Sequence, residues 1–217
     1  MQHALCNLKY AIIISLLLPA AAFAEYTPLE RPHWSLELKG GTFSPSLPDW
    51  EKFYGRKNMP EYALSLAYKF TRRIETGIEI GTARTTGTAA APLHDVLAGE
   101  VKYRIVPVNA FFVYRGSFGE DQWLVPYAGG GFTKILYWET VESQGGVKGS
   151  ANGYHARGGL QFLLDGLDRR AANSMYMDYG INHTYLFVEA EYTSAKVKGV
   201  SADLGGTAYR AGLLFEF

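Results

Sequence analysis

Apolar and polar residues alternate along much of this chain with a period of two residues. The pattern is clearest in the last ten residues, AYRAGLLFEF, where every second position is apolar: Tyr209, Ala211, Leu213, Phe215 and Phe217. A period of two places alternate side chains on opposite faces of a β-strand, so this strand has one apolar face. The alternation predicts an all-β protein.

Eight alternating segments follow one another, separated by stretches rich in Gly, Ser, Thr or Pro. They cover residues 34–43, 61–70, 73–82, 101–115, 123–139, 152–164, 183–195 and 206–217. Most exceed the ~5–6 residues usual for globular strands and reach the ~9–11 residues that a tilted strand needs to cross a bilayer. An even number of long strands is typical of membrane barrels. We therefore predict an eight-stranded, antiparallel, up-and-down transmembrane β-barrel.

The connections between these segments alternate in length. Thr71 and Arg72 join the second segment to the third, and 116–122 joins the fourth to the fifth. The longer connections are 44–60, 83–100, 140–151 and 196–205. Because bacterial barrels have short periplasmic turns and long outer loops, both chain ends are expected in the periplasm. The periplasmic link 165–182 is unusually long, and we expect a short helix through Arg169–Met177.

The two faces of the segments separate a membrane barrel from a soluble one. A soluble lipocalin-like barrel turns its apolar face inward around a ligand, whereas an outer-membrane barrel turns it outward to lipid. Here the polar face mixes charges with many Gly and Ala residues, which suit a narrow eight-stranded interior. Aromatic residues near the segment ends, such as Trp34, Tyr62 and Tyr114, suit interfacial girdles. The polar face is therefore expected inside.

The N-terminus is typical of an exported protein. Lys9 precedes the apolar run YAIIISLLLPAAAFA, which ends in a small-x-small cleavage pattern at Ala24. We predict a cleaved signal peptide over 1–24 and one barrel domain over 25–217, located in the bacterial outer membrane. The single cysteine, Cys6, lies within the signal, so no disulfide is expected in the mature chain.

Charge and hydropathy argue against two other classes. Loss of the signal removes one of 21 basic residues and none of 21 acidic residues, which leaves 20 against 21. This near neutrality argues against a nucleic-acid partner. No run of about 18 apolar residues follows Ala24, so no transmembrane helix is expected.

Closure of the barrel explains the final strand. Pairing of the last segment with the first would remove an exposed edge and turn alternate side chains to lipid. Tyr209, Leu213, Phe215 and the terminal Phe217 resemble the C-terminal signal by which outer-membrane barrels are recognised for insertion. The expected partners are outer-membrane lipids and the barrel assembly machinery, with small hydrophobic solutes as candidate ligands.

Two adjoining stretches narrow the class further: VPVNAFFVYR at 106–115 and LVPYAGGGFTKILY at 124–137. With the terminal strand, they resemble the fourth, fifth and eighth strands of the OmpW family, eight-stranded outer-membrane barrels in which a Pro-Tyr-x-Gly-x-Gly run opens the fifth strand. The resemblance covers the mature chain and implies an outer-membrane location with binding or passage of small hydrophobic molecules. The link 165–182 departs from it, because it is longer than the family's corresponding turn.

Charged residues on the expected inner face form a candidate polar network. They are Glu37, Lys39, Lys69, Glu75, Glu79, Arg115, Lys134, His155, Arg157, Glu189, Glu191, Arg210 and Glu216. One interpretation is a path for ions or solutes. The other is that the charges pair across a lumen too narrow to conduct, and the near balance of signs favours it.

The first long loop is a candidate ligand mouth. Pro48 and Asp49 can start a one-turn helix that ends at Gly55. An apolar cluster would then form at the outer rim from Trp50, Phe53, Tyr54 and Met59, with Leu93 added from the second loop. This cluster is either a hydrophobic ligand entry or simple loop packing at the interface.

An enzyme is the weakest interpretation. A lipid A-modifying barrel needs a histidine, a serine and an acid together at the rim. The only candidates are His94 with Asp95, His155 with Ser150, and His183 near Ser194, and none carries a known signature. We predict no catalytic residue and no cofactor, and no paired histidines indicate a metal. The leading function is binding or passing small hydrophobic molecules at the outer mouth; the rival is a structural or adhesion barrel with a plugged lumen.

Overall fold

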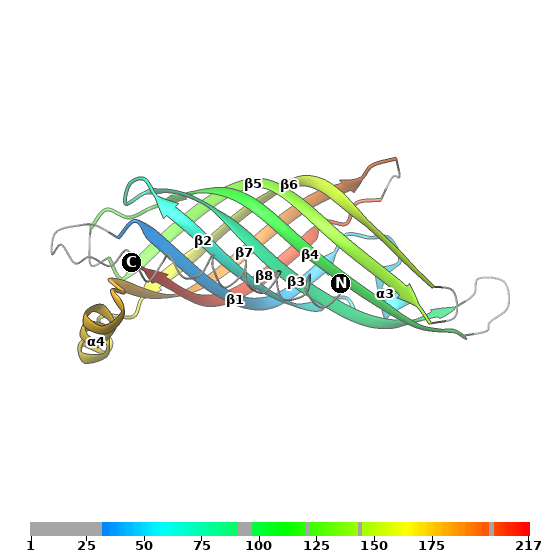
Figure 1. Ribbon diagram of the computed structural model, residues 1–217, viewed down its shortest axis with the longest axis horizontal. Coiled ribbons are helices and arrows are strands. Elements are labelled where there is room, and N and C mark those ends of the chain that lie inside the picture. Colours follow the sequence, from blue (N-terminus) through cyan, green and yellow to red (C-terminus); the bar gives the residue numbers. More distant parts are fainter. Residues whose placement is uncertain (1–31, 91–96, 120–121, 143–144, 200–201) are drawn as a thin grey trace, which may run out of the picture.

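The computed structural model is a closed barrel whose eight strands run antiparallel in sequence order (Figure 1). The structure describes residues 32–90, 97–119, 122–142, 145–199 and 202–217, so the predicted signal peptide, Leu93, His94 and Asp95 lie outside the described residues. The strands are β1 Trp34–Pro45, β2 Met59–Lys69, β3 Ile74–Ala90, β4 Leu97–Arg115, β5 Leu124–Val141, β6 Gly145–Leu163, β7 His183–Val197 and β8 Gly206–Glu216. The predicted fold class is confirmed.

The last strand closes the barrel against the first, as predicted. In this seam Leu38 of β1 lies opposite Leu213 of β8. Two backbone hydrogen bonds extend it to the chain end: the Trp34 amide donates to the Phe217 carbonyl at 2.8 Å, and the Phe217 amide donates to the Trp34 carbonyl at 3.0 Å. The C-terminal strand therefore has no free edge.

Two of the four long connections are shorter than expected. Residues 83–90 and 97–100, expected in a loop, extend β3 and β4, and most of 140–151 belongs to β5 and β6. Side chains in these stretches still point alternately inward and outward, since Ala83 and Thr85 are buried while Arg84 and Thr86 are exposed. Their outward side chains are polar or small, so the contrast between the two faces disappears from the sequence where the apolar belt ends.

Two helices lie at opposite ends of the barrel (Figure 1). Helix α4, Arg169–Tyr179, lies at the end that holds the C-terminus and the short connections; it begins at Asp168, whose carboxylate accepts from the Arg170 and Ala171 amides at 3.0 Å. The short helix predicted at Arg169–Met177 is confirmed and is two residues longer. Helix α3, Trp50–Tyr54, belongs to the other end. No helix in the described ranges is long and apolar enough to cross a membrane.

Candidate functional site

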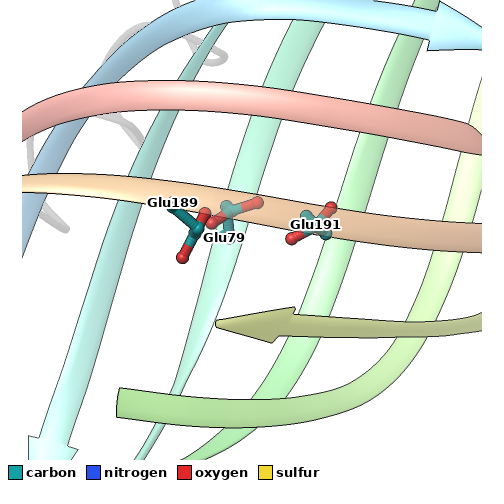
Figure 2. A group of neighbouring side chains, drawn as sticks. All are labelled: Glu79, Glu189 and Glu191. Carbon is teal, nitrogen blue, oxygen red and sulfur yellow. The ribbon is translucent and has the colours of Figure 1, made fainter. Parts of the chain in front are cut away.

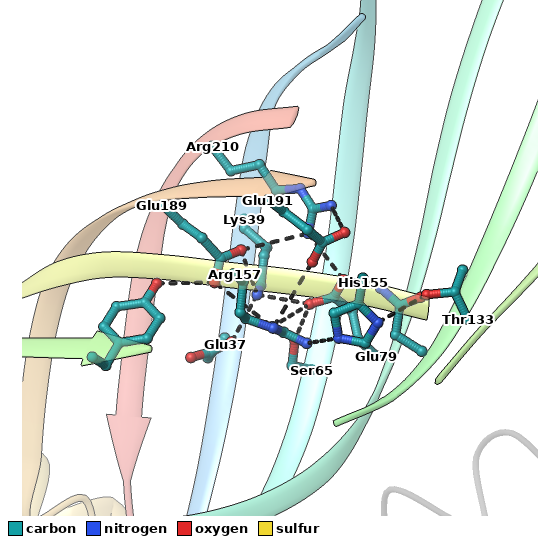
Figure 3. A network of polar contacts seen from close by, with 12 residues as sticks. Glu37, Lys39, Ser65, Glu79, Thr133, His155, Arg157, Glu189, Glu191 and Arg210 are labelled. Carbon is teal, nitrogen blue, oxygen red and sulfur yellow. Dashed lines mark hydrogen bonds and ion pairs between the residues drawn. The ribbon is translucent and has the colours of Figure 1, made fainter. Parts of the chain in front are cut away.

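The inward-facing positions bring charged side chains from most of the strands into the barrel (Figure 3). A strand contributes in this way because its alternate residues point to the barrel axis. Twelve of the thirteen predicted network residues are buried. They lie in two groups, one near the middle of the barrel and one near the α4 end.

Glu79 of β3 is the centre of the first group. Its carboxylate lies 2.7 Å from Lys39 Nζ, 3.0 Å from Arg157 Nη1 and 2.9 Å from Arg210 Nη1. It also accepts hydrogen bonds from Ser65 Oγ at 2.9 Å and Asn109 Nδ2 at 3.0 Å. One buried carboxylate thus pairs with cations from β1, β6 and β8.

Neighbouring carboxylates complete the middle group. Lys39 Nζ lies 2.9 Å from Glu37 and 3.4 Å from Glu189, which also accepts from the Tyr127 hydroxyl at 2.9 Å. Arg210 reaches Glu191 at 2.7 Å and Glu61 at 3.1 Å. Glu61 was not predicted, although its spacing of four from Ser65 places it on the same inner face of β2.

Two side chains tie this group to the wall. The Arg157 guanidinium lies 4.1 Å from the centre of the Phe111 ring. His155, two residues along β6, forms a hydrogen bond to Thr133 Oγ1 at 2.8 Å. Most members of the group are therefore held by partners on other strands.

Three of the acids, Glu79, Glu189 and Glu191, are close enough to share a cation (Figure 2). Their nearest oxygens lie within 4.8 Å of one another. All three face the ammonium of Lys39 or the guanidinium groups of Arg157 and Arg210. The protein's own cations therefore supply the neutralising charge in this trio.

A second ionic group lies near the α4 end. Lys69 and Arg115 both pair with Glu216 of the last strand, and Arg115 lies 4.0 Å from Glu75. Between the two ionic groups the interior is lined by apolar and aromatic residues. They are Ala67, Phe111, Val113, Tyr127, Phe187 and Leu214. The lumen is thus filled in layers of alternating polarity.

The predicted inward position of Lys134 was wrong. Its neighbours Thr133 and Ile135 are buried, whereas Lys134 is exposed on the outer wall. The three glycines Gly129–Gly131 before it carry no side chain, so apolar and polar positions do not distinguish the two faces of β5 at this point.

Helix α3 closes its end of the lumen with an apolar plug. Asp49 and Gly55, on either side of it, both adopt left-handed backbone with φ of 57° and 63°. This tight turn directs Trp50 and Tyr54 inward, where their rings stack with centroids 4.1 Å apart and Trp50 meets Tyr103 at 5.3 Å. Burial raises the pKa of the Tyr54 hydroxyl, and the Glu139 carboxylate adds to this, so the hydroxyl stays protonated.

Of the five predicted mouth residues, three meet, Phe53 does not, and Leu93 lies outside the described residues. Trp50, Tyr54 and Met59 are buried in one cluster, whereas Phe53 is 52% exposed on the other side of α3. The wall of the cluster comes from further inward positions, which were not among the predicted mouth residues. They are Phe43, Val101, Tyr103, Ile105, Ile135, Leu204 and small alanines. The sequence contains a signal for this apolar wall. Along the inner face of β4, the charged Arg115 at the α4 end is followed toward the α3 end by the apolar or aromatic Ile105, Tyr103 and Val101.

A shallow groove of about 450 Å³ runs beside α3. It is open to solvent and is lined by Pro45, Leu47, Trp50 and polar residues of the helix. One edge of Trp50 therefore faces the groove while most of its surface is buried against the plug.

The candidate catalytic pairs do not meet within the described residues. His155 points inward while Ser150 is exposed on the outer face of the same strand. His183 pairs with Asp165 at 2.8 Å near the α4 end, whereas Ser194 donates to Asp203 at 2.7 Å near the other end of β7. His94 and Asp95 lie outside the described residues.

We expect the purified protein to give no discrete conductance steps in a planar bilayer. Two ionic layers and two apolar layers fill the lumen, and an ion would have to displace buried, paired side chains to pass. Single-channel recording in potassium chloride measures this directly. Regular, voltage-stable openings of the unmodified protein would contradict the layered, filled interior.

Comparison with known proteins identifies the fold. No protein-family model matches the sequence, and no match was found among curated proteins. The chain is similar in structure to Neisserial surface protein A, with a TM-score of 0.56 and 12% identity over 85% of this chain and 97% of that one. It is also similar to the outer membrane protein OprG from Pseudomonas aeruginosa, with a TM-score of 0.53 and 14% identity over 86% and 97% of the two chains. The barrel has the architecture of small outer-membrane proteins.

Proposed function

We propose that this protein is an OmpW-like barrel of the bacterial outer membrane that binds small hydrophobic molecules at its outer mouth. The predicted signal peptide, the apolar outer wall and the barrel architecture support the location. The α3 end is taken as the outer end, because the short connections and the C-terminus are at the α4 end.

The observation that carries the ligand proposal is the plug itself. A chamber with apolar walls at Ile105, Ile135 and Tyr103 is occupied by two aromatic side chains of a single-turn helix. Such a short helix has few backbone hydrogen bonds of its own and is held chiefly by its side chains. A solute of similar size and polarity can replace the aromatic side chains without exposing the chamber walls to water.

In this proposal α3 is a lid that competes with the ligand. The fraction of molecules with an open lid limits the apparent affinity, so weakening the lid strengthens binding. Below the chamber lies the ionic layer around Glu79, which a hydrophobic molecule would enter only by separating paired charges. Binding at the mouth is therefore favoured over passage along the whole lumen.

Trp50→Ala is expected to strengthen binding of a small alkane by about tenfold, because the closed lid loses its largest contact. The measurement is hydrogen–deuterium exchange of residues 47–58 in nanodiscs as octane is added. The octane-to-lipid ratio at half-maximal increase in exchange should fall in the variant. The unmodified protein should show the same increase in exchange at a higher ratio.

Phe53→Ala is the matched control, since it removes an exposed aromatic ring from the same helix. It should leave the half-maximal ratio unchanged. Octane that alters exchange of this segment in neither the unmodified protein nor Trp50→Ala would reject the ligand mouth. The filled lumen would then favour the rival function, a structural or adhesion barrel.

A further inference from the structure

Charge on the outer wall of the barrel is confined to one end. From the α4 end up to Phe132 and Tyr154, the outward residues of the described strands are apolar, aromatic, small or hydroxyl-bearing. Basic side chains then appear on the same wall toward the α3 end. Four of them, Arg84, Arg104, Lys134 and Lys148, lie on adjacent strands and are exposed; we call them the basic arc.

The strand register places the members of the basic arc side by side. Arg84 pairs with Arg104, Arg104 with Trp138, and Trp138 with Lys148, so a single row crosses β3, β4, β5 and β6. Paired side chains on one face of a sheet lie about 5 Å apart. The Arg104 guanidinium lies 5.8 Å from the centre of the Trp138 ring. Lys134 is on the same face of β5, four residues from Trp138.

The basic arc has no acidic partner among the residues that the structure describes. In the described part of the chain, none of its four groups has a carboxylate within ion-pair distance, whereas each buried lysine and arginine in the barrel has one. The nearby Lys102 differs, since it lies 3.8 Å from Glu100. Four uncompensated positive charges on neighbouring strands repel one another, and an external anion relieves this repulsion.

The depth of the basic arc identifies what can reach it. Phe132 and Tyr154 are opposite each other and belong to the aromatic residues that mark a membrane interface. Lys134 lies two residues beyond Phe132, so the basic arc begins where the apolar belt ends and lipid head groups begin. In the proposed location, the molecules that meet the outer wall at this level are lipids, and a lipid that complements the basic arc carries negative charge.

The geometry points to the basic arc as a docking site for a phosphorylated glycolipid of the outer leaflet. Guanidinium and ammonium groups form short, charge-assisted hydrogen bonds to phosphate oxygens, and the exposed Trp138 adds an aromatic surface between them. The inference rests on the proposed outer-membrane location and orientation. It does not depend on the hydrophobic ligand at the mouth, because the basic arc is on the opposite side of the barrel wall.

The test compares two variants that lose the same number of charges. The first is Arg84→Gln, Arg104→Gln, Lys134→Gln and Lys148→Gln together. The control is Lys52→Gln, Arg56→Gln, Lys57→Gln and Lys198→Gln, exposed residues in the connections at the same end of the barrel. Both proteins are mixed in detergent with bisphosphorylated lipid A, and native mass spectrometry counts the lipid retained. A heat-dependent shift on electrophoresis verifies folding.

We expect the unmodified protein and the control to retain lipid A. The amount of lipid A retained by the first variant should be lower by a factor of about ten or more. Lipid A without its phosphates should not be retained by any of them. Equal retention by the first variant and the control would overturn the inference, as would equal retention of phosphatidylglycerol and lipid A by the unmodified protein. Should the first variant not fold, Arg84→Gln with Arg104→Gln is judged against Arg56→Gln with Lys57→Gln by the same criteria.

Discussion

Replacing Glu79 by alanine is expected to lower the free energy of unfolding by about 3–5 kcal/mol. The change removes the carboxylate that lies within 3.0 Å of Lys39, Arg157 and Arg210. All three cations stay buried, and the remaining acids already have their own contacts with them. The cost therefore comes from breaking three short ion pairs at once and from leaving the donor groups of these buried cations without the carboxylate that joins them.

Equilibrium unfolding in urea, with the protein in lipid vesicles, measures this difference. Glu51→Ala is the control, since Glu51 is an exposed glutamate of α3, and its loss should change stability by about 0.5 kcal/mol or less. Glu79→Gln keeps the shape and can still accept hydrogen bonds, so it should fall between the two. A variant Glu79→Ala as stable as the unmodified protein would show that the middle group does not hold the barrel together.

Replacing Gly131 by alanine is expected to cost about 1–3 kcal/mol, although it adds only one methyl group. A Cβ atom built at this position would lie 1.9 Å from the backbone carbonyl oxygen of Ala110 on β4. That oxygen belongs to the wall and cannot rotate away as the end of a long side chain could. The two strands must move apart, which weakens their pairing and the packing of Phe111 beside it.

Gly166→Ala provides the comparison, because a Cβ atom there meets nothing within 4 Å. It should leave the unfolding curve unchanged within about 0.5 kcal/mol. The same urea titration in vesicles serves for both glycine variants. Equal stability of Gly131→Ala and Gly166→Ala would mean that β4 and β5 separate at no cost, contrary to the close approach seen here.

The fold could be predicted because the contrast between an apolar outer wall and a filled, polar interior gives the strands a period of two. That contrast fades where the strands leave the apolar belt, so the sequence pattern predicts loops where β3 to β6 in fact continue. The contrast between the two faces is also absent at Gly129–Gly131. The prediction therefore placed Lys134 on the inner face, although it lies on the outer one. Its correct position proved informative, since Lys134 belongs to the basic arc.

The candidate site could be predicted only in part. The alternation of residues along the strands predicted most of the charged groups of the interior. The turn residues Pro48, Asp49 and Gly55 predicted the position of α3. The pairing of the charges could not be read from the chain, because partners such as Lys39 and Glu189 are 150 residues apart in sequence. The inward direction of Trp50 and Tyr54 depends on left-handed backbone at Asp49, which sequence pattern alone does not specify.

The ion pairs of the middle group also cross the seam between the first and last strands. Arg210 of β8 reaches Glu61 of β2, and Lys39 of β1 reaches Glu189 of β7, so charges fasten the two sides of the seam from within. If β1 and β8 were not paired, the charged groups of Arg210, Glu61, Lys39 and Glu189 would lack these partners in nonpolar surroundings. Insertion should consequently end in an all-or-none step, with few half-closed molecules, because the charges are neutralised only when the cylinder is complete.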